Sequence, residues 1–130
     1  MSQHVVIDAS AMVDLLARTD RAPAVRTRLA RTVLHAPAHF DAEVVSALGR
    51  LQRARALDAE HADAALAALV RAPVTRHDLT PLLAGAWARR EVLRLTDALY
   101  VELAEQRSYP LLTTDHRLAR GWPGASVIDI

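Results

Sequence analysis

The chain has 130 residues, no cysteine and a formal net charge of +1, and 52% of its residues are hydrophobic. This length and composition predict a single globular domain over residues 1–130, and they exclude disulfides, thiolate metal sites and a cysteine nucleophile. No apolar run approaches the roughly 18 residues that cross a membrane, and no export signal is visible, so we expect a cytoplasmic protein without membrane contact.

The predicted elements alternate short apolar strands with amphipathic helices. In chain order, we expect a strand at 4–7, helices over 10–17 and 24–31, a strand at 32–34, helices over 40–55 and 59–71, a strand at 74–75, helices over 81–91 and 97–107, a strand at 110–113, a helix over 115–120 and an edge strand at 127–128. Asp58, Thr80 and Thr96 are expected to cap helices. Strands separated by helices form right-handed parallel crossovers, which predicts an α/β fold whose mostly parallel sheet is covered on both faces.

Four acidic residues lie where a predicted strand or loop meets a helix. They are Asp8, Glu43, Asp97 and Asp115. Asp8 and Asp115 each follow an apolar strand, and ligands of such sheets bind at the carboxyl ends of the strands, so both acids are expected at one rim. Carboxylates gathered beside a buried sheet repel one another, and a divalent cation is the usual remedy. The pattern therefore predicts a magnesium-type active site.

A site of this kind needs no serine, cysteine or histidine nucleophile. Magnesium takes oxygen ligands, lowers the pKa of a bound water and stabilises charge on a phosphate. In agreement, the chain has no Gly-x-Ser-x-Gly elbow and no Walker glycine loop. Ser10 can orient Asp8, although a plain helix cap explains it equally well. The acids also have ordinary alternatives, because Asp8 and Asp115 can cap helices and Glu43 can be solvated.

Four segments carry the acids. They are Val5–Ser10, Glu43–Leu48, Thr96–Val101 and Leu111–Asp115. In order and spacing they resemble the motifs of the PIN-domain ribonucleases, and in particular the VapC-type toxins of bacterial toxin–antitoxin pairs. The resemblance spans nearly the whole chain. Two positions depart from the common pattern, because Arg94 replaces a small polar residue and Thr96 an aromatic one, but neither change removes an acid.

The resemblance implies a three-layer α/β/α sandwich of PIN-like fold and a metal-dependent endoribonuclease that uses Mg²⁺ or Mn²⁺. It also implies an RNA substrate, a homodimer and inhibition by a cognate antitoxin. By this likeness the metal-binding and catalytic acids are Asp8, Glu43, Asp97 and Asp115, and the polar helpers are Ser10 and Thr114.

Other α/β folds with acids at strand ends fit less well. A receiver domain needs a lysine, and this chain has none. Toprim domains and dehalogenase-type hydrolases need an Asp-x-Asp motif, whereas Asp8 is followed by Ala9 and Ser10. One alternative from another class stays open, namely a catalytically silent PIN-like module that binds RNA or a protein through the same rim.

The remaining polar residues have ordinary explanations. His35 and His39 have the spacing of a zinc-binding helix face, but Pro37 between them argues against a continuous helix. Asp14 and Glu102 are further candidates for a place near the site, but solvated helix faces are expected for both.

Lysine is absent, so all 16 basic residues are arginine, a composition typical of GC-rich genomes. Two clusters on predicted helices are expected to be solvated, unless the protein cuts RNA, in which case some members bind backbone phosphates. The clusters are Arg26, Arg28 and Arg31, and Arg50, Arg53 and Arg55.

Overall fold

The computed structural model describes residues 2–128. Its strands are β1 (Gln3–Ile7), β2 (Thr32–Pro37), β3 (Val74–His77), β4 (Leu111–Thr113) and β5 (Ala125–Val127). Its helices are α1 (Ala9–Leu16), α2 (Ala22–Leu29), α3 (Phe40–Arg53), α4 (Ala59–Arg71), the 3₁₀ turn η1 (Thr80–Leu82), α5 (Leu83–Ala88), α6 (Leu95–Arg107) and α7 (His116–Gly121).

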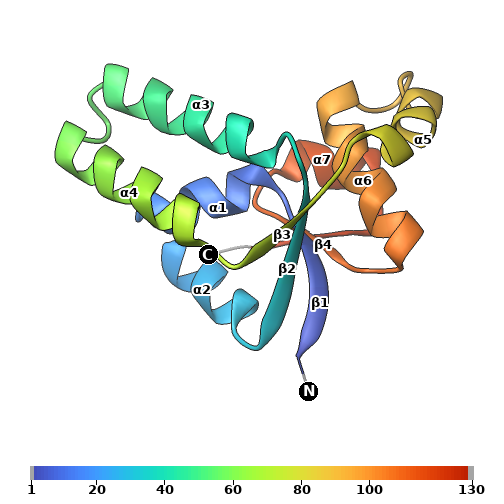
Figure 1. Cartoon of the computed structure of the whole chain (residues 1–130), viewed down its shortest axis with the longest axis horizontal. Coiled ribbons are helices and arrows are strands. Elements are labelled where there is room, and N and C mark those ends of the chain that lie inside the picture. The colour runs from blue at the N-terminus through green and yellow to red at the C-terminus, as the bar shows by residue number, and fades with distance from the viewer. Residues whose placement is uncertain (1, 129–130) are drawn as a thin grey trace.

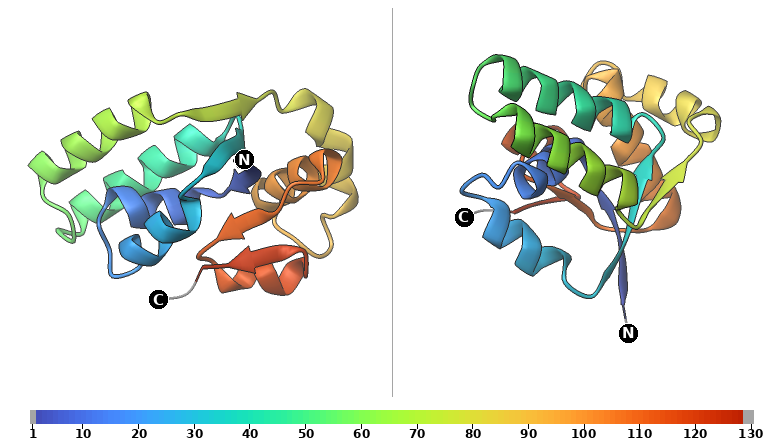
Figure 2. Two further views of the ribbon diagram at one scale, coloured as in Figure 1. Left: turned by 90° about the horizontal axis from the view of Figure 1, so that it is seen from below. Right: turned by 60° about the vertical axis from the view of Figure 1, so that its left-hand side comes forward.

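The five strands of residues 2–128 form one sheet in the order β3-β2-β1-β4-β5, and all four pairings are parallel. Helices α1 to α4 lie on one side of the sheet and α5 to α7 on the other (Figure 1). Figure 2 shows β5 beside β4 at the edge of the sheet, with α7 next to it. The predicted three-layer α/β fold is confirmed.

Strand β1 lies in the middle of the sheet, and its last three residues, Val5, Val6 and Ile7, are completely buried. A strand covered on both faces reads as a continuous apolar run, which is why the sequence shows no alternation here. The run ends abruptly at Asp8, which is only 6% exposed. The fold therefore places a carboxylate directly after the buried end of its central strand. No helix in residues 2–128 is both long and apolar enough to cross a membrane.

Several predicted boundaries were wrong. Strands β2 and β3 each extend to a later residue, because Pro37 pairs with His77 and the strand pairing outweighs local propensity. The predicted helix over 81–91 begins as a 3₁₀ turn and ends at Ala88. Thr96 does not cap α6: the cap position belongs to Arg94, and Thr96 lies exposed in the first turn.

Three histidines form a diagonal row across β1, β2 and β3. His4 Nδ1 lies 2.8 Å from His35 Nε2, and His35 Nδ1 lies 2.8 Å from His77 Nε2. The ring of Tyr109 packs against His4 and His35. Burial, together with the positive charge of His77, His4 and Arg107, lowers the pKa of His35. His35 is thus part of this row on β2, and His39 precedes α3, so the prediction that no continuous helix carries both histidines is confirmed.

Candidate active site

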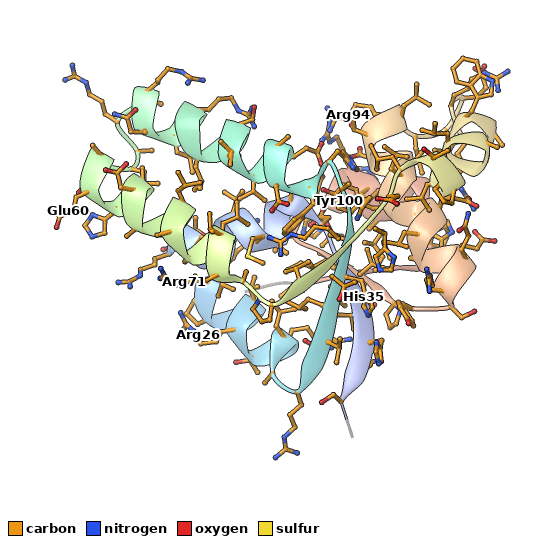
Figure 3. All side chains as sticks on the ribbon, in the orientation of Figure 1. Arg26, His35, Glu60, Arg71, Arg94 and Tyr100 are labelled. Atoms are coloured by element: carbon orange, nitrogen blue, oxygen red, sulfur yellow. The ribbon has the colours of Figure 1, made fainter. Side chains whose placement is uncertain are left out.

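A hollow of about 400 Å³ lies at the carboxyl ends of β1 and β4. The strand order changes direction between these two strands, which is where open α/β sheets bind ligands. All four predicted acids line the hollow, as do the predicted helpers Ser10 and Thr114. Figure 3 labels two further lining residues, Arg94 and Tyr100, which come from the segment that begins α6.

Asp8 caps α1 and is surrounded by donors. Its Oδ1 accepts from the backbone N–H of Ala11 at 3.1 Å and from Ser10 Oγ at 2.8 Å, and its Oδ2 accepts from Thr113 Oγ1 at 2.6 Å. Burial nevertheless outweighs these bonds and, with a smaller contribution from the charge of Asp115, raises the pKa of Asp8 to about 6. A cation beside this carboxylate would stabilise its charged form.

Thr113 connects two of the acids, and its role was not predicted from the sequence. Its completely buried hydroxyl donates to Asp8 Oδ2 and accepts from the backbone N–H of Asp115 at 2.9 Å. The helix-cap alternative for Asp115 is also correct, because its side chain caps α7 by accepting from Arg117 N. Burial alone would raise the pKa of Asp115, but the hydrogen bonds and charge of Arg117 hold it below its usual range.

Glu43 and Asp97 approach the hollow from α3 and α6. Arg94 Nε donates to Asp97 Oδ2 at 3.3 Å, and the Asp97 side chain is 19% exposed. Tyr100 donates its hydroxyl to Glu43 Oε1 at 2.6 Å. Burial and then the charge of Glu43 raise the pKa of Tyr100 strongly, so its hydroxyl keeps the proton that it donates. This bond links α3 to α6 across the sheet edge.

His39 supports the same carboxylate. Its Nε2 lies 3.4 Å from Glu43 Oε1 and 3.0 Å from the carbonyl oxygen of Thr96. Because a carbonyl oxygen only accepts, Nε2 must carry a proton, and the ring is oriented with a donor toward Glu43. The ring of His39 also packs against Tyr100, with centroids 4.9 Å apart. The two residues together fix the direction of the Glu43 side chain.

Removal of the Tyr100 hydroxyl is expected to lower the affinity of the site for its metal ion without abolishing metal binding. Groups that orient a metal-binding carboxylate typically contribute 10- to 100-fold to metal affinity or activity, so Tyr100→Phe should raise the metal concentration for half-maximal activity roughly tenfold. A metal titration of RNA cleavage measures this. Tyr109→Phe, in the histidine row, is the matched control and should leave the titration unchanged. Equal titrations of all three proteins would contradict a role for Tyr100.

Ser10 and Thr114 line the hollow and connect a further acid, Asp14, to it. Ser10 Oγ accepts from the backbone N–H of Thr114 at 3.3 Å and lies 3.1 Å from its hydroxyl. Thr114 Oγ1 donates to Asp14 Oδ2 at 2.6 Å. Of the two interpretations of Asp14, the solvated helix face was wrong and the place near the site is correct, because Asp14 lies four residues after Ser10 on the same face of α1. Glu102 does not line the hollow; it contacts Arg89 instead.

The chemistry of the lining groups fits a hard divalent cation, because their ligand atoms are carboxylate and hydroxyl oxygens. Such an ion would stabilise the buried negative charge of Asp8. In the present arrangement, however, no three Asp, Glu or His side chains of residues 2–128 are close enough to hold one ion. Asp97, Asp115 and Glu43 each face a donor from the protein, so we expect them to exchange these donors for the ion. The metal-ligand roles stay predictions.

The chain is similar to known proteins over nearly its whole length. The PIN domain family matches residues 5–121. Ribonuclease VapC3 of Mycobacterium tuberculosis is 70% identical over 127 residues, which cover 97% of this chain and 93% of that protein.

Two solved structures share the fold. The M. tuberculosis VapC20 structure, described as a sarcin–ricin loop cleaving toxin, has a TM-score of 0.69 at 19% identity and covers 91% of this chain and 95% of that one. A toxin–antitoxin complex from Klebsiella pneumoniae has a TM-score of 0.67 at 19% identity, with 96% of this chain and 98% of that one covered. Similarity at this level of identity supports the fold alone.

Proposed function

This chain belongs to the PIN-domain family of VapC-type ribonucleases, and from that membership we propose how its own residues cut RNA. It is a metal-dependent endoribonuclease and the toxin of a toxin–antitoxin pair. The observation that carries the site assignment is that four carboxylates, on segments far apart in the sequence, line one hollow at the carboxyl ends of β1 and β4. Asp8, Glu43, Asp97 and Asp115 would hold the ion, which we propose is Mg²⁺, with Mn²⁺ as a substitute.

The bound ion supplies Lewis acidity, which activates water and stabilises charge on the scissile phosphate. The protein contributes the orientation of its carboxylates. Ser10 and Thr113 hold both oxygens of Asp8, and Tyr100 holds Glu43. These hydroxyls donate hydrogen bonds to the carboxylates that they orient. Pre-oriented polar groups need little rearrangement when the phosphate reacts, which is where such sites gain most of their rate.

Incubation of the purified chain with total bacterial RNA tests this function. Discrete cleavage products are expected on a denaturing gel when Mg²⁺ or Mn²⁺ is added, and none when EDTA is present. A silent RNA-binding module, the remaining alternative, would shift RNA in a native gel but yield no products with either ion. That result would contradict the proposal.

The proposed partners follow from the same site. A cognate antitoxin is proposed to insert a segment into the acid-lined hollow and to offer an arginine or lysine in place of the metal's charge. Because its RNA substrate would be found in the cytoplasm, we propose that the protein acts there. We also propose a homodimer, because large apolar side chains are exposed on the α3–α4 hairpin, where Val45, Leu66 and Val70 are 44%, 43% and 74% exposed. Light scattering of the purified chain decides this, and a monomeric mass would refute it.

A further inference from the structure

Two arginines that line the hollow have no side-chain partner within residues 2–128. Arg21 precedes the first turn of α2, and Arg50 lies in the last turn of α3. Arg94, which also lines the hollow, is bound to Asp97. Arg117 does not line the hollow and is bound to Asp115. A guanidinium group that faces a shared cavity without a carboxylate partner is available to bind an anion there.

The loop that carries Arg21 is tied to the acidic rim through Asp14. One oxygen of Asp14 accepts from Thr114 Oγ1, which follows β4, and the other accepts from Thr19 Oγ1 at 2.6 Å. Thr19 Oγ1 in turn accepts from the backbone N–H of Arg21 at 3.3 Å. A second bond joins the same loop to α1, from Thr19 N to the carbonyl oxygen of Asp14 at 3.1 Å. One carboxylate thus holds the backbone of Arg21 in place relative to the predicted metal-binding rim.

We propose that Arg21 and Arg50 bind the RNA phosphates that flank the scissile one, and that Asp14 is the positioning residue for Arg21. The inference rests on the proposed function: if the acids act on RNA, its backbone must cross this hollow of about 400 Å³, and its phosphates then pass the two guanidinium groups. An acidic peptide has no comparable reason to enter an acid-lined hollow. With a net charge of only +1, attraction for RNA must come from such local contacts.

Binding and kinetics together test the two arginines. The probe is a fluorescently labelled single-stranded RNA pool of random sequence, and binding is measured by anisotropy on the Asp97→Asn background, which prevents cleavage. Arg21→Ala and Arg50→Ala are each expected to weaken binding roughly tenfold, and to reduce the slope of log affinity against log salt by about 0.7. In the active protein the same changes should raise KM and leave kcat within about twofold. Arg21→Lys and Arg50→Lys should retain part of the binding, since a point charge remains.

Arg71→Ala is the matched control. Arg71 is exposed at the end of α4 and does not line the hollow, and Figure 3 shows it well away from Arg94. Its removal should leave both affinity and salt slope at the wild-type values.

The positioning role of Asp14 is tested by comparing the RNA binding of single and double variants, because residues that act through one contact have non-additive effects. Asp14→Ala should weaken RNA binding about as much as Arg21→Ala, whereas the double variant should bind no more weakly than either single variant. A general loss of fold would instead lower the melting temperature and add to the effect of Arg21→Ala.

Two results separate failure of this inference from failure of the function. Wild-type affinity and salt slope in both arginine variants, with cleavage intact, would overturn the inference and leave the ribonuclease assignment in place. Weakened antitoxin binding with unchanged RNA binding would also overturn it, because it would assign the arginines to an acidic protein partner. Absence of RNA cleavage by the wild-type chain would refute the proposed function itself.

Discussion

Replacement of Asp97 by asparagine is expected to reduce metal-dependent RNA cleavage by roughly a thousandfold or more, because it removes a negative charge from the set that must hold the cation. Asparagine keeps the shape of the side chain and one acceptor oxygen. Asp97 is partly exposed and, within residues 2–128, its side chain is bonded only to Arg94, so the fold should survive the change. Initial rates of RNA cleavage at saturating Mg²⁺ measure the effect, and circular dichroism checks the fold.

Asp63→Asn provides the matched control for Asp97→Asn. Asp63 is an exposed carboxylate on α4 that does not line the hollow, so the same chemical change there should leave the rate unaltered. Comparable cleavage by the Asp97 variant and the control would remove Asp97 from the catalytic set.

Replacement of Asp8 by asparagine should abolish cleavage and yet stabilise the metal-free protein. The pKa of Asp8 is raised from 3.8 to about 6 in the folded chain, so between these pH values the folded state binds more protons than the unfolded state. The stability from the protonated carboxyl is present below pH 3.8 and is lost as the pH rises through about 6. The shift of about two units corresponds to about 3 kcal/mol of penalty at neutral pH, which asparagine does not incur.

Thermal unfolding in EDTA measures this effect. Asp8→Asn should melt roughly 10 °C above the wild type at about pH 7.5, and the difference should shrink at about pH 5. Added Mg²⁺ should then raise the melting temperature of the wild type more than that of the variant.

Asp115→Asn is the opposite case to Asp8→Asn. Arg117 lowers the pKa of Asp115, so its charge contributes stability that is present above pH 3.8 and is lost as the pH falls below that value. This variant should therefore melt below the wild type at neutral pH. An equal rise in melting temperature for Asp8→Asn and Asp115→Asn would show that general charge repulsion, and not the burial of Asp8, governs stability here.

The acids at the strand ends could be predicted because their position depends on sheet geometry alone. Parallel strands must bring Asp8 and Asp115 to one rim wherever the helices pack. Glu43 and Asp97 were assigned to the same site by the resemblance of their segments to the PIN-domain motifs, and both line the hollow. The order of alternating strands and helices was likewise enough to predict the layers of the fold.

The hydrogen bonds that orient these acids join residues far apart in the sequence, so no local sequence pattern predicts them. Tyr100 meets Glu43 across 57 positions of sequence, and Thr114 meets Asp14 across 100. The lengths of β2 and β3 were missed for the same reason, because their last residues are strand only through pairing with each other. Arg21 was missed because neither its sequence neighbours nor its position before α2 distinguishes it from the other arginines of the chain.

The row of His4, His35 and His77 limits how many protons this part of the sheet can take up. Three rings carry six nitrogens, and the two N–H···N bonds use four of them and one proton each. The two end nitrogens can take one proton each, so the row holds four protons with both bonds intact, one more than three neutral rings bring. A fifth proton must break a bond and place two positive rings side by side between neighbouring strands. With both hydrogen bonds intact, the row of three histidines therefore carries at most one positive charge.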